Sequence, residues 1–331
     1  MPRVTATMTV TEWLLDSDPS IRWQVMRDLG NEPADVVAAE RARVATEGWG
    51  ARLLALQGSD GQWDGGTYFP SWASTTPDFD SAWTATTFTL LLLRELGLDP
   101  ASAEARRAVG LVRDNSKWEH DGEDFFAGEV EPCINGEAVA LGSYFGQDVE
   151  GVVDRLLSEQ LSDGGWNCEA QFGSTRSSFD TTICVLDGLL EYERATGASD
   201  DVTEARKRAE EYLLERRLFR RLSTGEVVSD AFTSFSFPTW WHYDVLRGLD
   251  YLRKAGVAPD GRCAEAIGLV EKKRGADGRW PLENTHPGQV HFEMEEGDGQ
   301  PSRWNTLRAL RVLDWYHGGT ASGESSTERL A

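Results

Sequence analysis

Apolar residues recur at helical spacing along this chain, in two kinds of segment that alternate. One kind is charged on one side, and the other is more apolar and rich in small residues. The charged segments are 34–57, 101–115, 148–161, 201–217 and 260–274. The apolar segments are 20–30, 83–96, 133–146, 178–194, 240–255 and 303–316. This periodicity predicts an all-α chain, with the charged helices on the outside and the apolar helices on the inside.

A short sequence phrase recurs between these segments. Its clearest copies, each containing Asp-Gly-x-Trp, run from Gln57 to Trp63, from Gln160 to Trp166 and from Lys273 to Trp280. Weaker copies contain Asp121-Gly122 and Thr224-Gly225. The Asp-Gly pair supplies a turn residue that is free to take positive φ, and we expect the Trp to pack back under the helices that the turn joins. Self-similarity at this scale indicates repeated helical pairs.

The composition is that of a globular chain, with 40% hydrophobic and 27% charged residues. Its 13 Trp indicate a large core or an aromatic-lined cavity. The net charge of −22 argues against nucleic acid and anionic lipid as partners. The longest leucine run, Leu90–Leu93, is too short to span a bilayer, and the N-terminus lacks the pattern of a secretory signal. We therefore predict a cytoplasmic protein without a stable membrane anchor.

The domain organisation and the state of the cysteines follow from the same data. No long linker interrupts the helical pattern, so we predict a single domain over residues 1–317 and a disordered tail over 318–331. The four Cys have no CxxC spacing, and in a reducing compartment we expect free thiols.

The recurring phrase resembles the repeat of squalene–hopene cyclases and the related repeat of protein prenyltransferase β subunits. The resemblance extends from about Ile21 to Trp315. It implies an (α/α)6 toroid, which is a double ring of helical hairpins, with an active site where the amino ends of the inner helices converge. The toroid hosts several chemistries, so the repeat does not fix the reaction.

The first functional hypothesis that the resemblance implies is a terpene-cyclase-like enzyme acting on an apolar isoprenoid. Cyclases of this superfamily that protonate an alkene use an Asp-x-Asp-Asp sequence. The segment Asp78-Phe-Asp80-Ser81 matches it at three of four positions, with Asp80 at the donor position and Ser in place of the last Asp. A buried carboxyl beside another carboxylate keeps its proton. The alternative is that these acids only begin a helix.

Other residues near the starts of the inner segments complete this hypothesis. Asp180 is a further candidate acid, although its spacing from Ser177 also fits a helix cap. Aromatic faces stabilise carbocations, and each of these rings can instead belong to the core. The candidate substrate-binding aromatics are Trp83, Phe179, Trp240, Trp241, Tyr243 and Trp304.

The second hypothesis is a zinc site of the kind found in protein prenyltransferases and lanthionine cyclases, which share the toroid. Cys133, Cys168 and His242 lie near the starts of consecutive inner segments, and Asp180 or His291 can replace one ligand. Three protein ligands and an open position suit a catalytic zinc that activates a thiolate or water. A helix N-terminus is expected to lower the pKa of Cys133. Neither Asp-x-Cys nor Cys-His, the family's own zinc motifs, occurs in the chain.

A third possibility is a non-catalytic toroid that binds a hydrophobic ligand or partner. Apart from zinc, the sequence indicates no cofactor. It does not fix the oligomeric state or identify the substrate.

Overall fold

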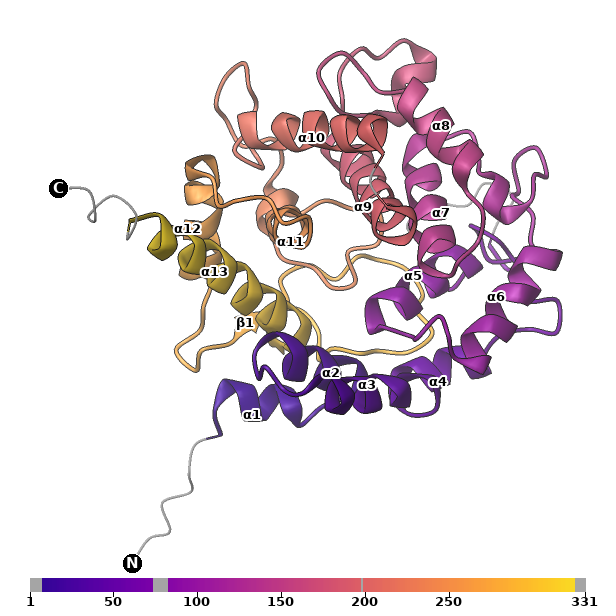
Figure 1. Ribbon diagram of the computed structural model, residues 1–331, viewed down its shortest axis with the longest axis horizontal. Helices are drawn as coiled ribbons and strands as arrows, with labels where there is room; N and C mark the ends of the chain where they lie inside the picture. The colour runs from indigo at the N-terminus through magenta and orange to yellow at the C-terminus, as the bar shows by residue number, and fades with distance from the viewer. Residues whose placement is uncertain (1–7, 74–82, 198, 325–331) are drawn as a thin grey trace, which may run out of the picture.

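The computed structural model describes residues 8–73, 83–197 and 199–324, and it is mostly helical (Figure 1). This confirms the prediction of an all-α chain. The inner segments contain α2 (Pro19–Asp28), α5 (Thr86–Leu96), α7 (Pro132–Tyr144), α9 (Phe179–Thr196), α11 (Val245–Lys254) and α13 (Arg303–Glu324). The outer segments contain α3 (Ala34–Ala42), α4 (Gly48–Ala55), α6 (Ala103–Asn115), α8 (Glu150–Ser158), α10 (Asp200–Glu215) and α12 (Ala264–Lys272). A short helix, α1 (Val10–Leu15), precedes them.

Successive inner helices contact one another around the middle of the molecule (Figure 1). Helix α5 contacts α7, α7 contacts α9, α11 contacts α13, and α13 contacts α2. A hydrogen bond of 3.0 Å from Trp23 to the carbonyl of Leu96 links α2 to α5. An ion pair of 2.9 Å between Arg247 and Asp187 links α11 to α9. The first and last inner helices therefore lie side by side.

Helices α7 and α9 make the closest of these contacts. A Cβ on Gly136 would lie 2.6 Å from the carbonyl of Cys184, and one on Gly188 would lie 2.4 Å from the carbonyl of Gly136. Only glycine allows two helix backbones to approach this closely. Side chains at the amino ends of the two helices are thereby held near each other.

The repeated Trp residues pack as predicted. Trp63, Trp166 and Trp280 are completely buried, and each indole N–H donates a hydrogen bond to a carbonyl ten residues earlier. Each Trp backbone N–H donates to a threonine hydroxyl on the next inner helix. These threonines are Thr86, Thr182 and Thr306, at 3.1, 3.1 and 2.9 Å. Each repeat is thus tied to both helices that its turn joins.

The segment that follows Trp280, the Trp of the last repeat, crosses near the amino ends of the inner helices. The segment begins after strand β1 (Trp280–Pro281) and returns to strand β2 (Pro301–Ser302), which pairs antiparallel with β1. Between the two strands it extends to α5. The carbonyl of Pro287 accepts a hydrogen bond of 2.7 Å from Trp83, and the ring of His291 lies 2.9 Å from the hydroxyl of Thr89. This crossing segment lies against the amino end of α5.

Helix α13 ends at Glu324, inside the segment where the sequence predicts a disordered tail from 318. The first part of that tail is helical because extending an existing helix costs much less than starting one. Residues 325–331 lie outside the described part. Among the described helices, every one is too short or too polar to cross a membrane.

Candidate metal centre and central cavity

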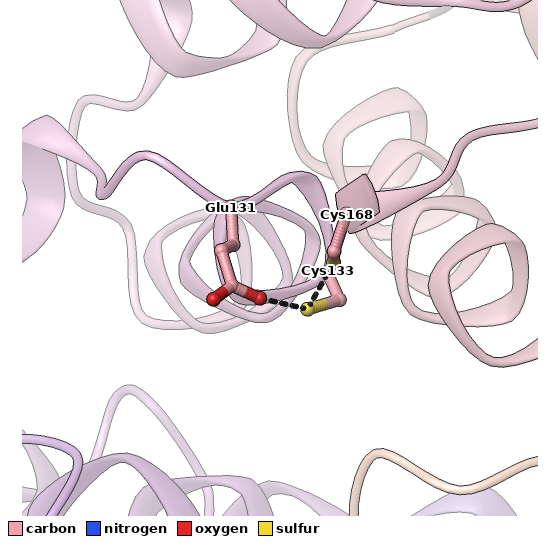
Figure 2. Close-up of side chains that lie close together, drawn as sticks. All are labelled: Glu131, Cys133 and Cys168. Atoms are coloured by element: carbon pink, nitrogen blue, oxygen red, sulfur yellow. Dashed lines mark hydrogen bonds between the residues drawn. The ribbon is translucent and has the colours of Figure 1, made fainter. Parts of the chain in front are cut away.

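Three ligating side chains meet where α7 begins. Pro132 occupies the first position of α7, where its fixed φ suits a helix start, so that Glu131 and Cys133 flank the first turn. Cys168 opens a short 3₁₀ helix (Cys168–Phe172) that Asn167 caps through the backbone N–H of Glu169. The close packing of α7 on α9 places this short helix beside the start of α7 (Figure 2).

The three side chains point toward one another (Figure 2). The sulfur atoms of Cys133 and Cys168 are 2.9 Å apart, and the Cys133 sulfur is 3.6 Å from a carboxylate oxygen of Glu131. One ligand atom from each residue lies within 4.8 Å of the others, and the group is half-buried. The hydroxyl of Thr181 lies 3.4 Å from the Cys168 sulfur. This group can hold a metal ion, and two sulfurs with a carboxylate oxygen are ligands that zinc accepts.

The structure therefore brings together two of the predicted ligands, Cys133 and Cys168, and does not bring His242 to them. The His242 ring stacks on Trp241 and on His286, each with ring centroids 3.7 Å apart. Burial and the neighbouring His286 lower the pKa of His242 to about 3. Within the described residues the metal-ligand group takes Glu131 as its third member. The turn before α11 directs the ring of His242 into this aromatic stack instead.

The sequence contains a local signal for Glu131 that differs from the family's zinc motifs. Glu131-Pro-Cys133 has the spacing of Asp-x-Cys, with a carboxylate one methylene longer.

The predicted fall in the pKa of Cys133 is wrong. The hydrogen bond with Cys168, burial, and nearby Cys184 and Glu131 raise the pKa of this thiol well above its ordinary value. These effects outweigh the field of the helix terminus.

A cavity of about 90 Å³ lies among the inner helices, and about half of its lining residues are charged. Glu137 on α7 and Arg94 on α5 face it, as do the paired Asp187 and Arg247. Burial raises the pKa of Glu137 to about 8, although Arg247 and Arg94 oppose this rise. Sequence analysis missed these residues, and their signal is a charge within an otherwise apolar inner segment.

A second cavity of about 50 Å³ lies under the crossing segment and is largely apolar. Trp83 and Trp240, both predicted to bind substrate, line it and stack with ring centroids 5.0 Å apart and an interplanar angle of 3°. Phe237, Pro238 and Trp240 border both cavities. The turn before α11 therefore separates the first cavity, which has many charged residues, from the second cavity, which is largely apolar.

The other predicted aromatic residues pack elsewhere. Phe179 and Tyr243 contact Phe232 in a cluster beside α10, and the Tyr243 hydroxyl donates to the carbonyl of Leu218. Trp304 is fully buried against Phe237, with ring centroids 4.4 Å apart. These contacts belong to the core. Trp241 stacks on His242, as described above.

The predicted acids have separate outcomes. A carboxylate oxygen of Asp180 accepts a hydrogen bond of 2.7 Å from the backbone N–H of Tyr243, so this residue positions the turn before α11. Burial raises its pKa. The cap of α9 is Ser178, whose side chain accepts from the N–H of Thr181. Asp78 and Asp80 lie outside the described residues.

No protein-family model and no curated protein sequence matches this chain. The resemblance to terpenoid cyclases and protein prenyltransferases therefore stays a prediction from the repeat.

Proposed function

We propose that this protein is a zinc-dependent enzyme whose metal is held by Glu131, Cys133 and Cys168. The observation that carries the proposal is the convergence of these three side chains, with ligand atoms within 4.8 Å, from two separate elements. Two sulfurs and one carboxylate leave a fourth tetrahedral position open, which is the arrangement of a catalytic rather than a structural zinc site. When bound, the zinc would supply a Lewis acid that activates a thiol or a water molecule.

The chain's own residues supply a proton-transfer group near this site. Glu137 follows Cys133 by four residues on α7, so both lie on one face of the helix, one turn apart. With a pKa of about 8, Glu137 holds a proton at neutral pH and can exchange it with a molecule in the central cavity. Binding a nucleophile at the metal and transferring a proton at Glu137 would together serve a hydrolase or a thiol transferase.

The proposal includes the fold and the location. The circuit of contacts from α2 through α5, α7, α9, α11 and α13 back to α2 supports a closed (α/α)6 toroid. The metal group lies at the amino end of α7, as expected for the mouth of such a ring. Free thiols as metal ligands favour a reducing compartment, which supports the cytoplasm.

Metal analysis tests this proposal. Protein purified without chelators or a polyhistidine tag is expected to contain about one zinc per chain. Cys133→Ser and Cys168→Ser should each lose most of it because each removes a thiolate ligand, whereas Cys263→Ala, far along the chain in another buried site, should retain it. Turnover in a panel of esters, amides and thiol acceptors should disappear with chelator and return with added zinc. Wild-type protein with no stoichiometric metal after zinc loading would contradict the proposal.

A terpene-cyclase-like activity is the second candidate, and the stacked Trp83 and Trp240 favour it. They line an apolar pocket, and parallel indoles present the electron-rich faces that stabilise carbocations. This candidate predicts that Asp80→Asn abolishes turnover of a linear isoprenoid while the protein stays folded. It predicts no loss of activity on removal of metal, which separates it from the first proposal.

A further inference from the structure

Glu137 lacks the partners that a buried carboxyl normally has. It is 3% exposed, it lines the central cavity, and no described residue donates a hydrogen bond to either of its side-chain oxygens. Buried polar groups are hydrogen-bonded in the great majority of cases, and an unsatisfied one carries a desolvation cost. A residue in this state at a cavity wall indicates a ligand that completes its hydrogen bonds.

Arg94 presents the opposite charge to the same cavity. Its Nη1 is buried without a partner, and no described carboxylate lies within 4.0 Å of its guanidinium. Arg94 and Glu137 are close enough to affect each other electrostatically but do not form an ion pair. A few atoms of ligand can therefore lie between them.

The other charged groups of the cavity already have partners. Arg247 contacts Asp187 and donates to two backbone carbonyls, and Lys254 contacts Asp250 at 2.9 Å. Arg308 donates to the carbonyl of Ser236 at 3.0 Å. Two groups of the cavity therefore lack hydrogen-bond partners: the carboxyl oxygens of Glu137, which can accept, and the guanidinium Nη1 of Arg94, which can donate.

We propose that the central cavity binds a small zwitterion, a molecule of the amino-acid class whose ammonium group contacts Glu137 and whose carboxylate contacts Arg94. Glu137 would lose its proton when the ammonium binds, because an adjacent cation favours the ionised carboxylate. The resulting ammonium–carboxylate contact and the guanidinium–carboxylate contact at Arg94 are charge-assisted and strong when desolvated. About 10–15 Å³ is enough for one water molecule, so a cavity of about 90 Å³ has room for a molecule with several non-hydrogen atoms. The second, apolar cavity lies on the other side of Phe237 and Trp240. It can accept a longer side chain of the ligand if these two residues move.

The position of the bound zwitterion connects this site to the metal. Cys133 and Glu137 are one turn apart on α7, so a molecule held at Glu137 would lie about one helical turn, ~5 Å along the axis, from the metal group, whose ligands are not among the residues that line the cavity. The role of the zwitterion as substrate rests on the proposed function, whereas its binding does not. Measurements with and without metal therefore distinguish the two.

Calorimetric titration and thermal shift with a panel of α- and ω-amino acids test the binding, using both zinc-loaded and chelator-treated full-length protein. At least one zwitterion should bind, and it should bind more tightly than the amine or the carboxylic acid that carries only one of its two groups. Glu137→Gln and Arg94→Gln should each weaken binding by at least about tenfold, since each leaves one ligand charge unpaired in a buried site. The exposed controls Asp154→Asn and Arg107→Gln should bind as wild type.

Several outcomes would overturn this inference. One is that no zwitterion binds either form of the protein. Another is that binding survives in both Glu137→Gln and Arg94→Gln, with circular dichroism showing that both are folded. A third is that the simple amine binds as tightly as the zwitterion. Binding that persists in zinc-free Cys133→Ser protein would support the cavity site and leave the metal proposal to be decided by its own assay.

Discussion

Glu137 and Cys133 face the same side of α7, yet their surroundings suit them to different tasks. Cys133 lies at the first turn beside two other ligand atoms, where a metal cation would deprotonate it. Glu137 lies one turn deeper, where burial keeps its proton on. At the scale of the residue, the site therefore combines a cation-binding group with a neutral acid.

The pH dependence of stability should report on Glu137. The charged groups around it are Arg94 on α5, Arg247 on α11, Asp187 on α9 and Glu131 on α7. Its pKa is about 8 in the folded protein, against an ordinary value of 4.5, so stability is full below pH 4.5 and falls as pH rises toward 8. Glu137→Gln removes this loss. The unfolding free energy of the variant minus that of the wild type should therefore be about 4 kcal/mol larger at pH 9 than at pH 5.

Urea denaturation at the two pH values measures this difference. The exposed Glu204→Gln is the matched control, and its effect should be nearly the same at both. An equal effect of Glu137→Gln at pH 5 and pH 9 would show that Glu137 is ionised throughout and that the cavity solvates it.

At the scale of the element, the Asp-Gly-x-Trp turn is the repeating unit of stability. Gln160 donates to the carbonyl of Gly164 at 2.7 Å and to that of Ala205 on α10 at 2.8 Å, so the turn is fixed to the next outer helix. Gly164 has φ +101°, and a Cβ there would lie 2.6 Å from the carbonyl of Arg208. Both its conformation and its neighbours therefore require glycine.

Substitution of two glycines should give opposite results. Gly164→Ala should lower the free energy of unfolding by about 2 kcal/mol or more, because it adds strain at positive φ and a backbone clash. Gly110→Ala, in the middle of α6 with open space around it, should raise it by about 0.5–1 kcal/mol. Chemical denaturation of both variants checks the pair. A neutral Gly164→Ala would mean that the turn can rearrange without cost.

This turn also shows how much of the structure the sequence could predict. Helix positions, the inner and outer sets and the burial of the repeated Trp follow from periodicity and turn chemistry, which are local. The spacing of Glu131 and Cys133 is also local, but the approach of Cys168 to them and the pair of Glu137 and Arg94 depend on which helices become neighbours. Glu137 and Arg94 are isolated charges in apolar segments, and only the packing of α5, α7 and α11 brings them to one cavity. The position of the His242 ring depends likewise on its tertiary stack with His286.

At the scale of the whole molecule, the contact between α13 and α2 joins the last inner helix to the first. Arg311 on α13 is 4% exposed, forms an ion pair with Asp28 and donates to the side-chain oxygen of Gln24 at 2.8 Å. Gln24 in turn donates to the carbonyl of Glu95 on α5 at 3.2 Å. This polar network therefore connects three of the inner helices.

Breaking the network should loosen the whole molecule. Arg311→Met leaves Asp28 with only its exposed neighbour Arg27 and leaves Gln24 with an unmet acceptor, so the unfolding free energy should fall by about 2 kcal/mol or more. The exposed Arg113→Met on α6 should change it by less than about 0.5 kcal/mol. Adding Asp28→Asn to Arg311→Met should recover part of the loss. Additive losses in the double variant would show that the two residues are not coupled.

The meeting of α2 with α13 also constrains how a chain of this kind can evolve. An open solenoid gains or loses repeats at its ends, where special capping repeats shield the last apolar face from water. In the proposed toroid, the contact between α2 and α13 takes the place of such a cap. Duplicating or deleting one hairpin would then separate the two helices, so that in this proposal closure, rather than chain length, fixes the number of hairpins.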